Sequence, residues 1–219
     1  MNKSYNGARV ALINFLGIDF AHTAVLDVGC YCGSNAQYLK KKFNDVYYVG
    51  VENDPMAISK MGSHVDEVLD IDLDGFSSDV LVQQTERRVF DIVILGDVLE
   101  HLKDPGKLLR EIKKVTDENS TLLVSIPNVQ YYETFLMLFI GRFPRRERGL
   151  FDKTHLRWFT KREFVDLVRR DYQVVGFKRV FRLIERPSRI NRLVPVFLPF
   201  LWILAPFFTF QMYFALKKR

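Results

Sequence analysis

The stretch Val25–Gly33 reads V-L-D-V-G-C-Y-C-G and decides how the surrounding chain must fold. The apolar residues around Asp27 predict a buried strand, and Gly29 and Gly33 predict a tight turn into a helix that begins near Ser34. The two glycines can take positive φ and leave room for a ligand beside the backbone. The new helix offers unpaired N–H groups to such a ligand. Glycine in a turn can also serve packing alone, so the remaining sequence must decide between the two roles.

Further apolar segments alternate with amphipathic ones along the chain. Besides the first strand, we expect strands at 46–51, 65–73, 90–95, 121–126, 172–184 (bulged near Gly176) and 209–216, and helices at 4–16, 34–43, 56–61, 105–115, 131–140 and 161–170. This alternation predicts an α/β fold with a parallel sheet and right-handed crossovers. The segment at 65–73 alternates apolar and acidic residues, which is typical of a strand near the sheet edge.

Polar residues follow the predicted strands at the points where the strands end, namely Asp27, Glu52, Asp72, Asp97 and Asn128. Ligands of parallel α/β sheets bind at the carboxyl ends of the strands, so these residues are expected to converge on one site. Glu52 lies 19 residues beyond Gly33, where a carboxylate can hold the ribose hydroxyls of an adenosine-type cofactor. The alternative for Glu52 alone is a solvated acid at a strand end.

Composition limits the class of protein. The 219 residues, 48% of them hydrophobic and 26% charged, predict a single globular domain over 1–219. Residues 1–141 carry a net charge of −7 and residues 142–219 a net charge of +13, so the second part could face nucleic acid, an anionic membrane or a phosphorylated substrate. Cys30 and Cys32 have no second Cys/His pair to complete a metal site, and no metal is expected. With no secretory signal in view, a reducing, cytoplasmic location is expected.

Several motifs together resemble the class I S-adenosylmethionine-dependent methyltransferases over about residues 20–130. The resemblance rests on Val25–Gly33, Glu52, the acidic segment Asp70–Asp72 and the run F-D-I-V-I-L-G-D-V-L-E-H-L-K-D-P at 90–105. The segment T-H-L-R-W-F-T-K-R-E-F at 154–164 resembles the small-molecule branch, which includes members of cell-envelope saccharide pathways. The implied fold is a Rossmann-like, seven-stranded, mostly parallel sheet with helices on both faces and an antiparallel last strand.

The resemblance implies S-adenosyl-L-methionine as cofactor and assigns its contacts. The implied cofactor-binding residues are Asp27, Gly29 and Gly33 around the methionine part, Glu52 on the ribose hydroxyls, Asn53, Asp72 and Leu73 around the adenine, and Asp97 beside the methionine end and the substrate. A dinucleotide is less well supported, because G-x-x-x-G lacks the three-glycine pattern.

Methyl transfer from a sulfonium mainly requires alignment of donor and acceptor, but a hydroxyl acceptor also needs a base. We assign this role, or that of a substrate ligand, to His155, and a catalytic role to Asp97. The alternative is that His155 only holds its segment together by hydrogen bonds. His101, in the L-E-H-L turn, is expected either to be structural or to support the site from behind the residues that contact the ligands.

Residues 128–160 form an excursion between strands that we interpret as a substrate cap. The expected substrate-binding residues in it are Tyr131, Tyr132, Arg148, Arg157 and Trp158. Its clustered arginines could grip a phosphate or carboxylate on the acceptor, or form a solvated face.

Residues 193–216 carry no charge over 24 positions, which is long enough for a membrane span. Pro195, Pro199 and Pro206 disfavour one continuous helix, and the sheet still needs its last strand, which 209–216 can supply. We therefore expect a leading helix within 1–20 and an apolar insertion at 189–208 before that strand. Peripheral membrane contact through Leu193–Phe208 would bring the enzyme to a lipid-linked acceptor at the inner face of the cytoplasmic membrane. A substrate channel or a homodimer patch are the alternatives.

The predicted function is methyl transfer to a small or lipid-linked acceptor, with a saccharide hydroxyl in cell-envelope biosynthesis as the leading candidate. A nucleic-acid (RNA) methyltransferase is an alternative suggested by the basic C-terminal part. It is disfavoured, because Gly96–Leu99 reads G-D-V-L where an exocyclic-amine enzyme would carry N/D-P-P-[YF]. A non-catalytic protein that keeps the cofactor is the other alternative.

Overall fold

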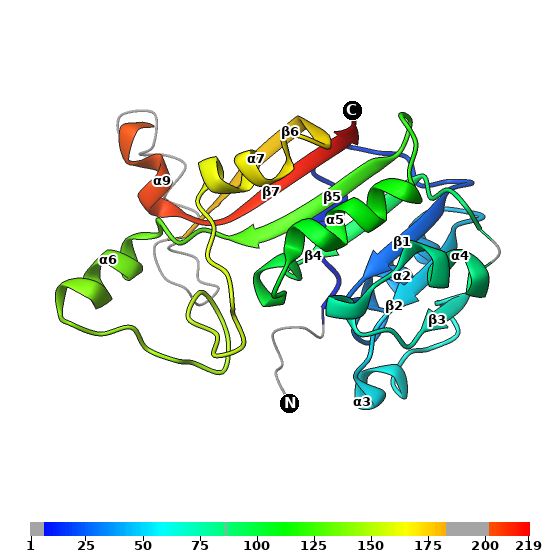
Figure 1. Ribbon diagram of the computed structural model, residues 1–219, viewed down its shortest axis with the longest axis horizontal. Helices are drawn as coiled ribbons and strands as arrows, with labels where there is room; N and C mark the ends of the chain where they lie inside the picture. The colour runs from blue at the N-terminus through cyan, green and yellow to red at the C-terminus, as the bar shows by residue number, and fades with distance from the viewer. Residues whose placement is uncertain (1–6, 86, 183–201) are drawn as a thin grey trace.

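Seven strands form one sheet in the computed structural model, which describes residues 7–85, 87–182 and 202–219 (Figure 1). The strands are β1 (Ala24–Val28), β2 (Tyr47–Val51), β3 (Glu67–Leu69), β4 (Ile92–Gly96), β5 (Thr121–Pro127), β6 (Tyr172–Phe181) and β7 (Thr209–Lys218). Their order is β3-β2-β1-β4-β5-β7-β6. The pairs from β3 to β5 are parallel, and β7 runs antiparallel to both β5 and β6. The predicted seven-stranded sheet with an antiparallel last strand is confirmed.

Helices cover both faces of this sheet, as expected. The helices are α1 (Val10–Ile13), α2 (Ser34–Lys42), α3 (Pro55–Ile58), α4 (Ser78–Thr85), α5 (Pro105–Lys114), α6 (Tyr132–Phe139), α7 (Lys161–Val168) and α9 (Ala205–Phe208), with short 3₁₀ turns η2 (Leu73–Gly75), η3 (Leu99–His101) and η6 (Trp202–Leu204). Neighbouring residues of β1 point to opposite faces, where Val25 joins the apolar cluster under α1 and α2 and Leu26 joins the cluster under α4, α5 and α7. Burial on both faces explains why the central strands are continuous apolar runs.

The N-terminal helix is shorter than the predicted span 4–16, and residues 4–6 lie outside the described part. α1 has four residues, of which Leu12 and Ile13 are buried against the sheet. After α1 the chain bends at Gly17, which has φ of +66°, and the side chains of Phe15 and Leu16 lie against Gly176 of β6. The apolar spacing that resembled a longer helix therefore belongs to one helical turn followed by a bend.

Two other predictions need correction at the edges of the sheet. The predicted strand 65–73 contains only the three residues of β3, because η2 begins at Leu73. α4 was not predicted, since its apolar residues 80–82 are consecutive in sequence and show no helical period. The expected bulge near Gly176 is confirmed by a register shift between β6 and β7 at Val174/Gly176.

The segment after β5 is anchored at the end of the sheet and extends away from it as α6 and a long loop (Figure 1). The Asn128 side chain donates hydrogen bonds to the carbonyls of Pro206 (2.9 Å) and Thr209 (2.8 Å). Behind it, Tyr131, Phe151 and Phe210 form a small apolar cluster. Asn128 thus joins the cap to the start of β7.

The predicted apolar insertion 189–208 is described only from residue 202, and Leu193–Leu201 lie outside the described residues. β7 begins at Thr209, where the last strand was expected. Among the described residues, no helix combines the length and apolar character that crossing a membrane requires.

Candidate functional site

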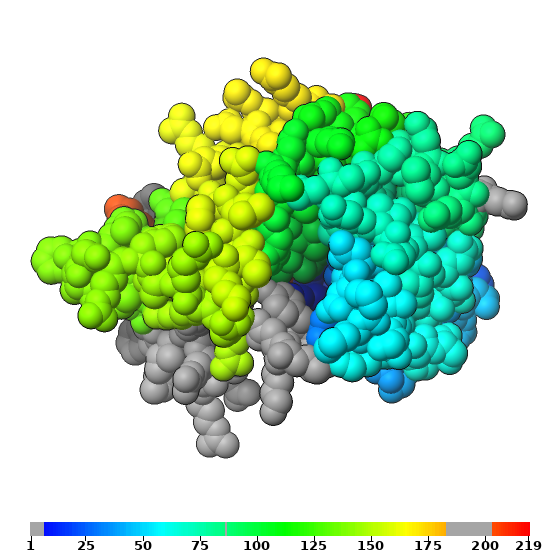
Figure 2. All heavy atoms as spheres, turned by 60° about the horizontal axis from the view of Figure 1, so that its bottom comes forward, coloured from blue at the N-terminus to red at the C-terminus, as the bar shows by residue number. Residues whose placement is uncertain are grey.

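A cavity of about 470 Å³ lies at the carboxyl ends of β1, β2 and β4. Its size is within the range of about 300–1,000 Å³ that is usual for small-molecule sites. In Figure 2 the surface is hollowed between the half of the molecule that carries β2 and β3 (cyan) and the segment near residue 154 (yellow-green). The lining residues are Gly7, Arg9, Asp27, Gly29, Cys30, Tyr31, Ser34, Asn35, Glu52, Asp54, Leu73, Gly96, Asp97, Val98, His101, Leu102 and Thr154. Of the predicted cofactor residues, five therefore line one cavity: Asp27, Gly29, Glu52, Leu73 and Asp97.

The glycine turn has the predicted positive φ angles, +74° at Gly29 and +72° at Gly33. A Cβ on Gly29 would lie 2.8 Å from the side chain of Val98, and a Cβ on Gly33 would lie 2.8 Å from Val65. Both glycines are therefore required by backbone conformation and by close packing. Gly29 also lines the cavity, whereas Gly33 lies outside its lining and caps α2.

Glu52 links the end of β2 to the glycine turn. Its Oε2 accepts a hydrogen bond from the backbone N–H of Tyr31 at 3.0 Å, and its Oε1 accepts from the backbone N–H groups of the next two residues. The carboxylate is thus fixed at the cavity wall before any ligand binds. Asn53 and Asp72 are exposed outside the cavity lining, and Asp72 caps η2 through the N–H of Asp74.

Asp27 forms the floor of the cavity. Its carboxylate is buried and accepts hydrogen bonds from the Tyr48 hydroxyl and from Nδ2 of Asn35 (3.0 Å). Burial raises the pKa of Asp27 to about 6, although these two hydrogen bonds oppose the shift. Oδ1 of Asn35 accepts from the backbone N–H of Arg9 at 2.7 Å. The floor therefore connects β1, β2, α2 and the N-terminal segment.

Asp97 follows β4 in a left-handed conformation, with φ of +59°. Its carboxylate lies 2.5 Å from Nη2 of Arg9 and accepts hydrogen bonds from the Ser125 hydroxyl and from Nε2 of Gln211. These donors come from the N-terminal segment, β5 and β7, and sequence reasoning missed all three. Because its oxygens already have strong donors, Asp97 is better suited to fix the geometry of the cavity than to accept a proton.

Glu100 is buried directly behind Asp97, in η3. Burial and the negative charge of Asp97 raise the pKa of Glu100 well above its usual range. Its Oε2 is buried without a hydrogen-bond partner among the described residues. Its carbonyl oxygen accepts from the backbone N–H groups of Leu156 (2.8 Å) and Arg157 (3.0 Å), which ties the cap to this turn.

His101 and His155 form a pair with ring centroids 4.7 Å apart. His101 lines the cavity, whereas His155 is 5% exposed and lies behind it. The expected arrangement differs, because in it His155 faced the acceptor and His101 was structural or supported the site from behind. The reason is that the cap segment folds back over η3, which buries the residue from the cap.

Burial lowers the pKa of both imidazoles, so both are neutral near pH 7. Nδ1 of His155 lies 3.0 Å from the carbonyl oxygen of Leu150, and Nδ1 of His101 lies 3.3 Å from the carbonyl oxygen of Thr154. A carbonyl only accepts. The Thr154 hydroxyl, 3.0 Å from Nδ1 of His101, donates its own hydrogen to Asp152 at 2.7 Å, so it too accepts from the ring. These contacts assign the proton to Nδ1 and leave Nε2 as an acceptor in each ring.

Glu100, His101 and His155 also offer one ligand atom each within 4.8 Å of one another. Two neutral imidazoles and a carboxyl group that releases its proton on binding are a suitable ligand set for a divalent transition-metal ion. Among the residues that the structure describes, this is the cluster that could hold a metal, at a place where the sequence predicted none.

The predicted substrate residues lie around the cap rather than at the cavity. Tyr131 is fully buried and packs against Tyr132 and Phe210, with ring centroids 4.7 and 5.3 Å away. Arg157 is exposed and donates to the carbonyl of Lys103. Arg148 is also exposed, and Trp158 packs on Phe143. None of the predicted substrate residues lines the described cavity, and their contact with an acceptor stays a prediction.

A family model described as a methyltransferase domain matches residues 4–175. The chain therefore belongs to this methyltransferase family, as its sheet order and the cavity at the strand ends indicate. It is a class I S-adenosylmethionine-dependent methyltransferase, and S-adenosylmethionine is its cofactor.

The chain is similar to several known methyltransferases in sequence or in fold. The ubiquinone biosynthesis O-methyltransferase of Azorhizobium caulinodans is 30% identical over 118 residues, which are 53% of this chain and 45% of the relative. This chain thus spans about half the length of the curated relative. An S-adenosylmethionine-dependent methyltransferase from Mesorhizobium loti shares the fold with a TM-score of 0.63 and 14% identity, over 96% of each chain. One from Archaeoglobus fulgidus has a TM-score of 0.62 and 17% identity, over 99% of this chain and 97% of that one.

The residues of the cavity fit this cofactor. Glu52 offers a carboxylate at the end of β2, where ribose hydroxyls can donate to it. Among the described lining residues, the acidic ones outnumber the single Lys or Arg, which is Arg9, and this suits a ligand with a positive sulfonium; the acidic residues are Asp27, Glu52, Asp54 and Asp97. Sequence reasoning did not place Glu100 in this site or His101 on the cavity wall, although one signal was available: they follow Asp97 by three and four residues, a spacing that places side chains near one another on a helical turn.

Proposed function

We propose that this methyltransferase acts on a hydroxyl oxygen of a small or lipid-linked acceptor, with His101 as the general base. The observation that carries the proposal is a neutral imidazole on the cavity wall whose Nδ1 is occupied by Thr154, so that Nε2 is available as an acceptor. The name of the curated relative, an O-methyltransferase, supports oxygen as the methylated atom. A saccharide hydroxyl in cell-envelope biosynthesis remains our leading candidate for the acceptor.

The cofactor would be held by Glu52 at its ribose, by the turn that contains Gly29 at its methionine part, and by Leu73 at its adenine. When bound it supplies a methyl group already activated on a sulfonium, so no further electrophile is needed. Asp27 and Asp97 would set the shape and charge of the wall beside that group.

The role of His101 is to remove the hydroxyl proton as oxygen begins to bond to the methyl carbon. The imidazolium formed in this way is stabilised by the nearby negative charges of Asp152 and Asp97, which favour the charged ring. His155 packs edge-on against His101 and keeps its orientation, and is therefore a positioning residue.

The experiment is a screen for S-adenosylhomocysteine release over phenols, free saccharides and lipid-linked saccharides. We expect turnover with a hydroxylated acceptor, and a loss of about 10²–10⁴-fold in kcat for His101→Ala with little change in cofactor affinity. His64→Ala, in a surface loop outside the cavity lining, is the matched control. Wild-type turnover in His101→Ala, or methylation of an amine or carbon acceptor only, would contradict the proposal.

We also propose that the enzyme works in the cytoplasm, at the inner face of the cytoplasmic membrane. α6 and α9 lie side by side beyond the sheet, with the rings of Phe135 and Phe207 5.1 Å apart (Figure 1). Large apolar side chains on and beside them are exposed, with Phe139 at 90% and Ile203 at 70%. The exposed arginines 142, 145 and 148 follow α6 directly. An apolar surface beside cations suits an anionic bilayer. The proposed membrane-contacting surface therefore includes α6 in addition to the predicted segment Leu193–Phe208.

A further inference from the structure

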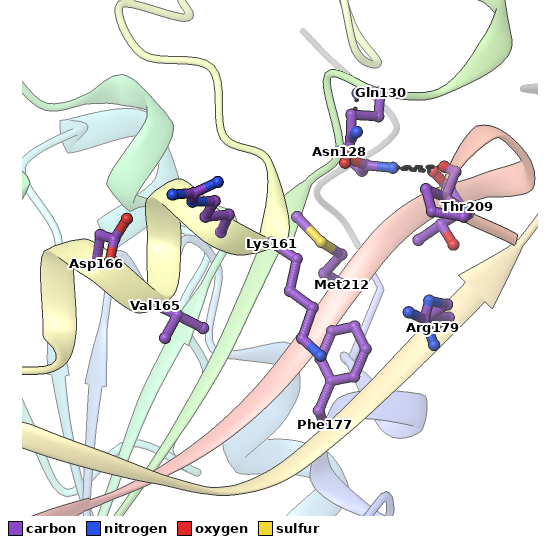
Figure 3. A pocket seen from close by; sticks show the side chains of 11 residues that line it. Asn128, Gln130, Lys161, Val165, Asp166, Phe177, Arg179, Thr209 and Met212 are labelled. Carbon is purple, nitrogen blue, oxygen red and sulfur yellow. Dashed lines mark hydrogen bonds between the residues drawn. The ribbon is translucent and has the colours of Figure 1, made fainter. Parts of the chain in front are cut away.

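A second cavity, of about 440 Å³, lies where β5 ends and β7 begins, between α7 and the end of β6 (Figure 3). It shares no lining residue with the cofactor cavity. Its lining residues are Asn128, Gln130, Lys161, Arg162, Val165, Asp166, Phe177, Arg179, Pro206, Thr209 and Met212. Nothing in the methyl-transfer chemistry requires this cavity.

The floor of this second cavity is apolar or already hydrogen-bonded. Met212 is buried, and Val165 and Phe177 form the sides. The Asn128 amide donates to two carbonyls, and the Thr209 hydroxyl donates to the carbonyl of Ala205 at 2.7 Å. A sugar or another neutral polar ligand would therefore find few free partners there, whereas a hydrocarbon group would be well accommodated.

The rim of the same cavity is cationic. Nζ of Lys161 lies 4.2 Å from the centroid of the Phe177 ring, and Cζ of Arg179 lies 5.0 Å from it, so the two cations face one ring (Figure 3). Arg162 adds a third positive charge. Within the described part of the chain, none of these three forms an ion pair. Asp166 is the single carboxylate among the described lining residues, and its Oδ1 lies 3.3 Å from Nη1 of Arg169.

We infer that this cavity binds an anionic amphiphile, namely a phosphate ester attached to a hydrocarbon group. A phosphate matches the planar guanidinium of Arg179 and the compact charge of Lys161. Both cations bind a phosphate more strongly than they bind the face of the Phe177 ring. The hydrocarbon then covers Phe177, Val165 and Met212. A membrane phospholipid and a dissolved phosphate ester share this chemistry. The inference stands independently of the proposed acceptor and base.

The test is calorimetric titration of the full chain with octyl phosphate below its micelle concentration. The comparison probes are octyl glucoside, which lacks the phosphate, and inorganic phosphate, which lacks the hydrocarbon chain. We expect octyl phosphate to bind at least about tenfold more tightly than either. Equal binding of octyl glucoside, or no binding of octyl phosphate, would overturn the inference.

Substitutions in the lining test whether octyl phosphate binds in this cavity. Lys161→Gln/Arg179→Gln should weaken octyl phosphate binding at least about tenfold and leave S-adenosylmethionine binding unchanged. Lys41→Gln/Lys178→Gln is the matched control, because both lysines are exposed outside the cavity and Lys178 is the chain neighbour of Arg179. If the double variant has a lowered Tm, the single variant Arg179→Gln replaces it. Unchanged binding in the cavity variant would contradict the assignment.

Flotation with phosphatidylglycerol vesicles distinguishes the two sources of the ligand. Weaker flotation of the cavity variant than of its control identifies a membrane lipid. Equal flotation, together with weakened octyl phosphate binding, identifies a dissolved phosphate ester.

Discussion

Asp97 is the residue at which distant parts of the chain meet. Arg9, Ser125 and Gln211 all donate to its carboxylate, and its φ of +59° aims that carboxylate back into the cavity. A non-glycine residue in this region costs about 1–3 kcal/mol, which the three donors offset. The N-terminal segment is therefore held at one side of the cavity by this ion pair and by the hydrogen bond from the Arg9 backbone N–H to Asn35.

The pH dependence of the reaction follows from His101. Burial lowers its pKa, and only the neutral ring can accept a proton, so kcat/KM should fall as the pH drops below a midpoint that is under about 6.5. Above that midpoint the rate should be constant until other groups titrate. The measurement is a pH–rate profile of wild type and His101→Gln, and an acid limb that persists in the variant would assign it to another group.

A substitution at Gly29 tests whether the turn after β1 requires glycine at this position. Gly29→Ala should lower the free energy of unfolding by about 1–3 kcal/mol, because alanine is strained at φ of +74° and its Cβ would lie 2.8 Å from Val98. Urea unfolding measures the loss. Gly75→Ala is the control, since no atom lies within 4 Å of its added Cβ, and it should change stability by less than about 0.5 kcal/mol. Equal effects of the two substitutions would mean that Gly29 is not under this constraint.

At the scale of elements, the local signals for helix starts are confirmed. Asp54 caps α3 through the N–H of Met56, and Thr160 and Glu163 form the predicted capping box of α7. These signals depend on residues within three positions of one another. The position of α6, in the cap, has no such local signal. It depends on the hydrogen bonds of Asn128 and on ring contacts with residues far along the chain.

The exposed face of α6 and α9 carries a prediction of its own. Leu136→Asp/Phe139→Asp/Ile203→Asp should reduce flotation with anionic vesicles at least about tenfold, because burying each side chain contributes up to about 1.5–3 kcal/mol. Val80→Asp on α4, also exposed but outside this face, is the control. A loss of dimer in sedimentation with unchanged flotation would instead identify a second copy of the chain as the occupant.

At the scale of the whole molecule, the α/β class and the side of the sheet that carries the site could be predicted from alternation and from polar residues after apolar runs. The seven-stranded sheet with an antiparallel last strand was implied only by the resemblance to the methyltransferase family. The wall of the cavity could be predicted only in part. Gln211 lies 114 residues from Asp97 and enters the site through the antiparallel insertion of β7, for which no local signal exists. Which of His101 and His155 faces the cavity depends on how the cap folds back over η3. This too is set by contacts between residues far apart in the sequence.

The central claim is that the cavity at the ends of β1, β2 and β4 holds S-adenosylmethionine through Glu52. The most direct measurement is calorimetric titration of the cofactor into wild type, Glu52→Gln and Asp72→Asn. Glu52→Gln removes the charge and leaves one accepting oxygen where the carboxylate has two, so affinity should fall about 10- to 100-fold. Asp72→Asn, outside the cavity lining, should change affinity less than about twofold. One cofactor bound per chain with this ranking is the predicted result, and unchanged affinity in Glu52→Gln would contradict the account.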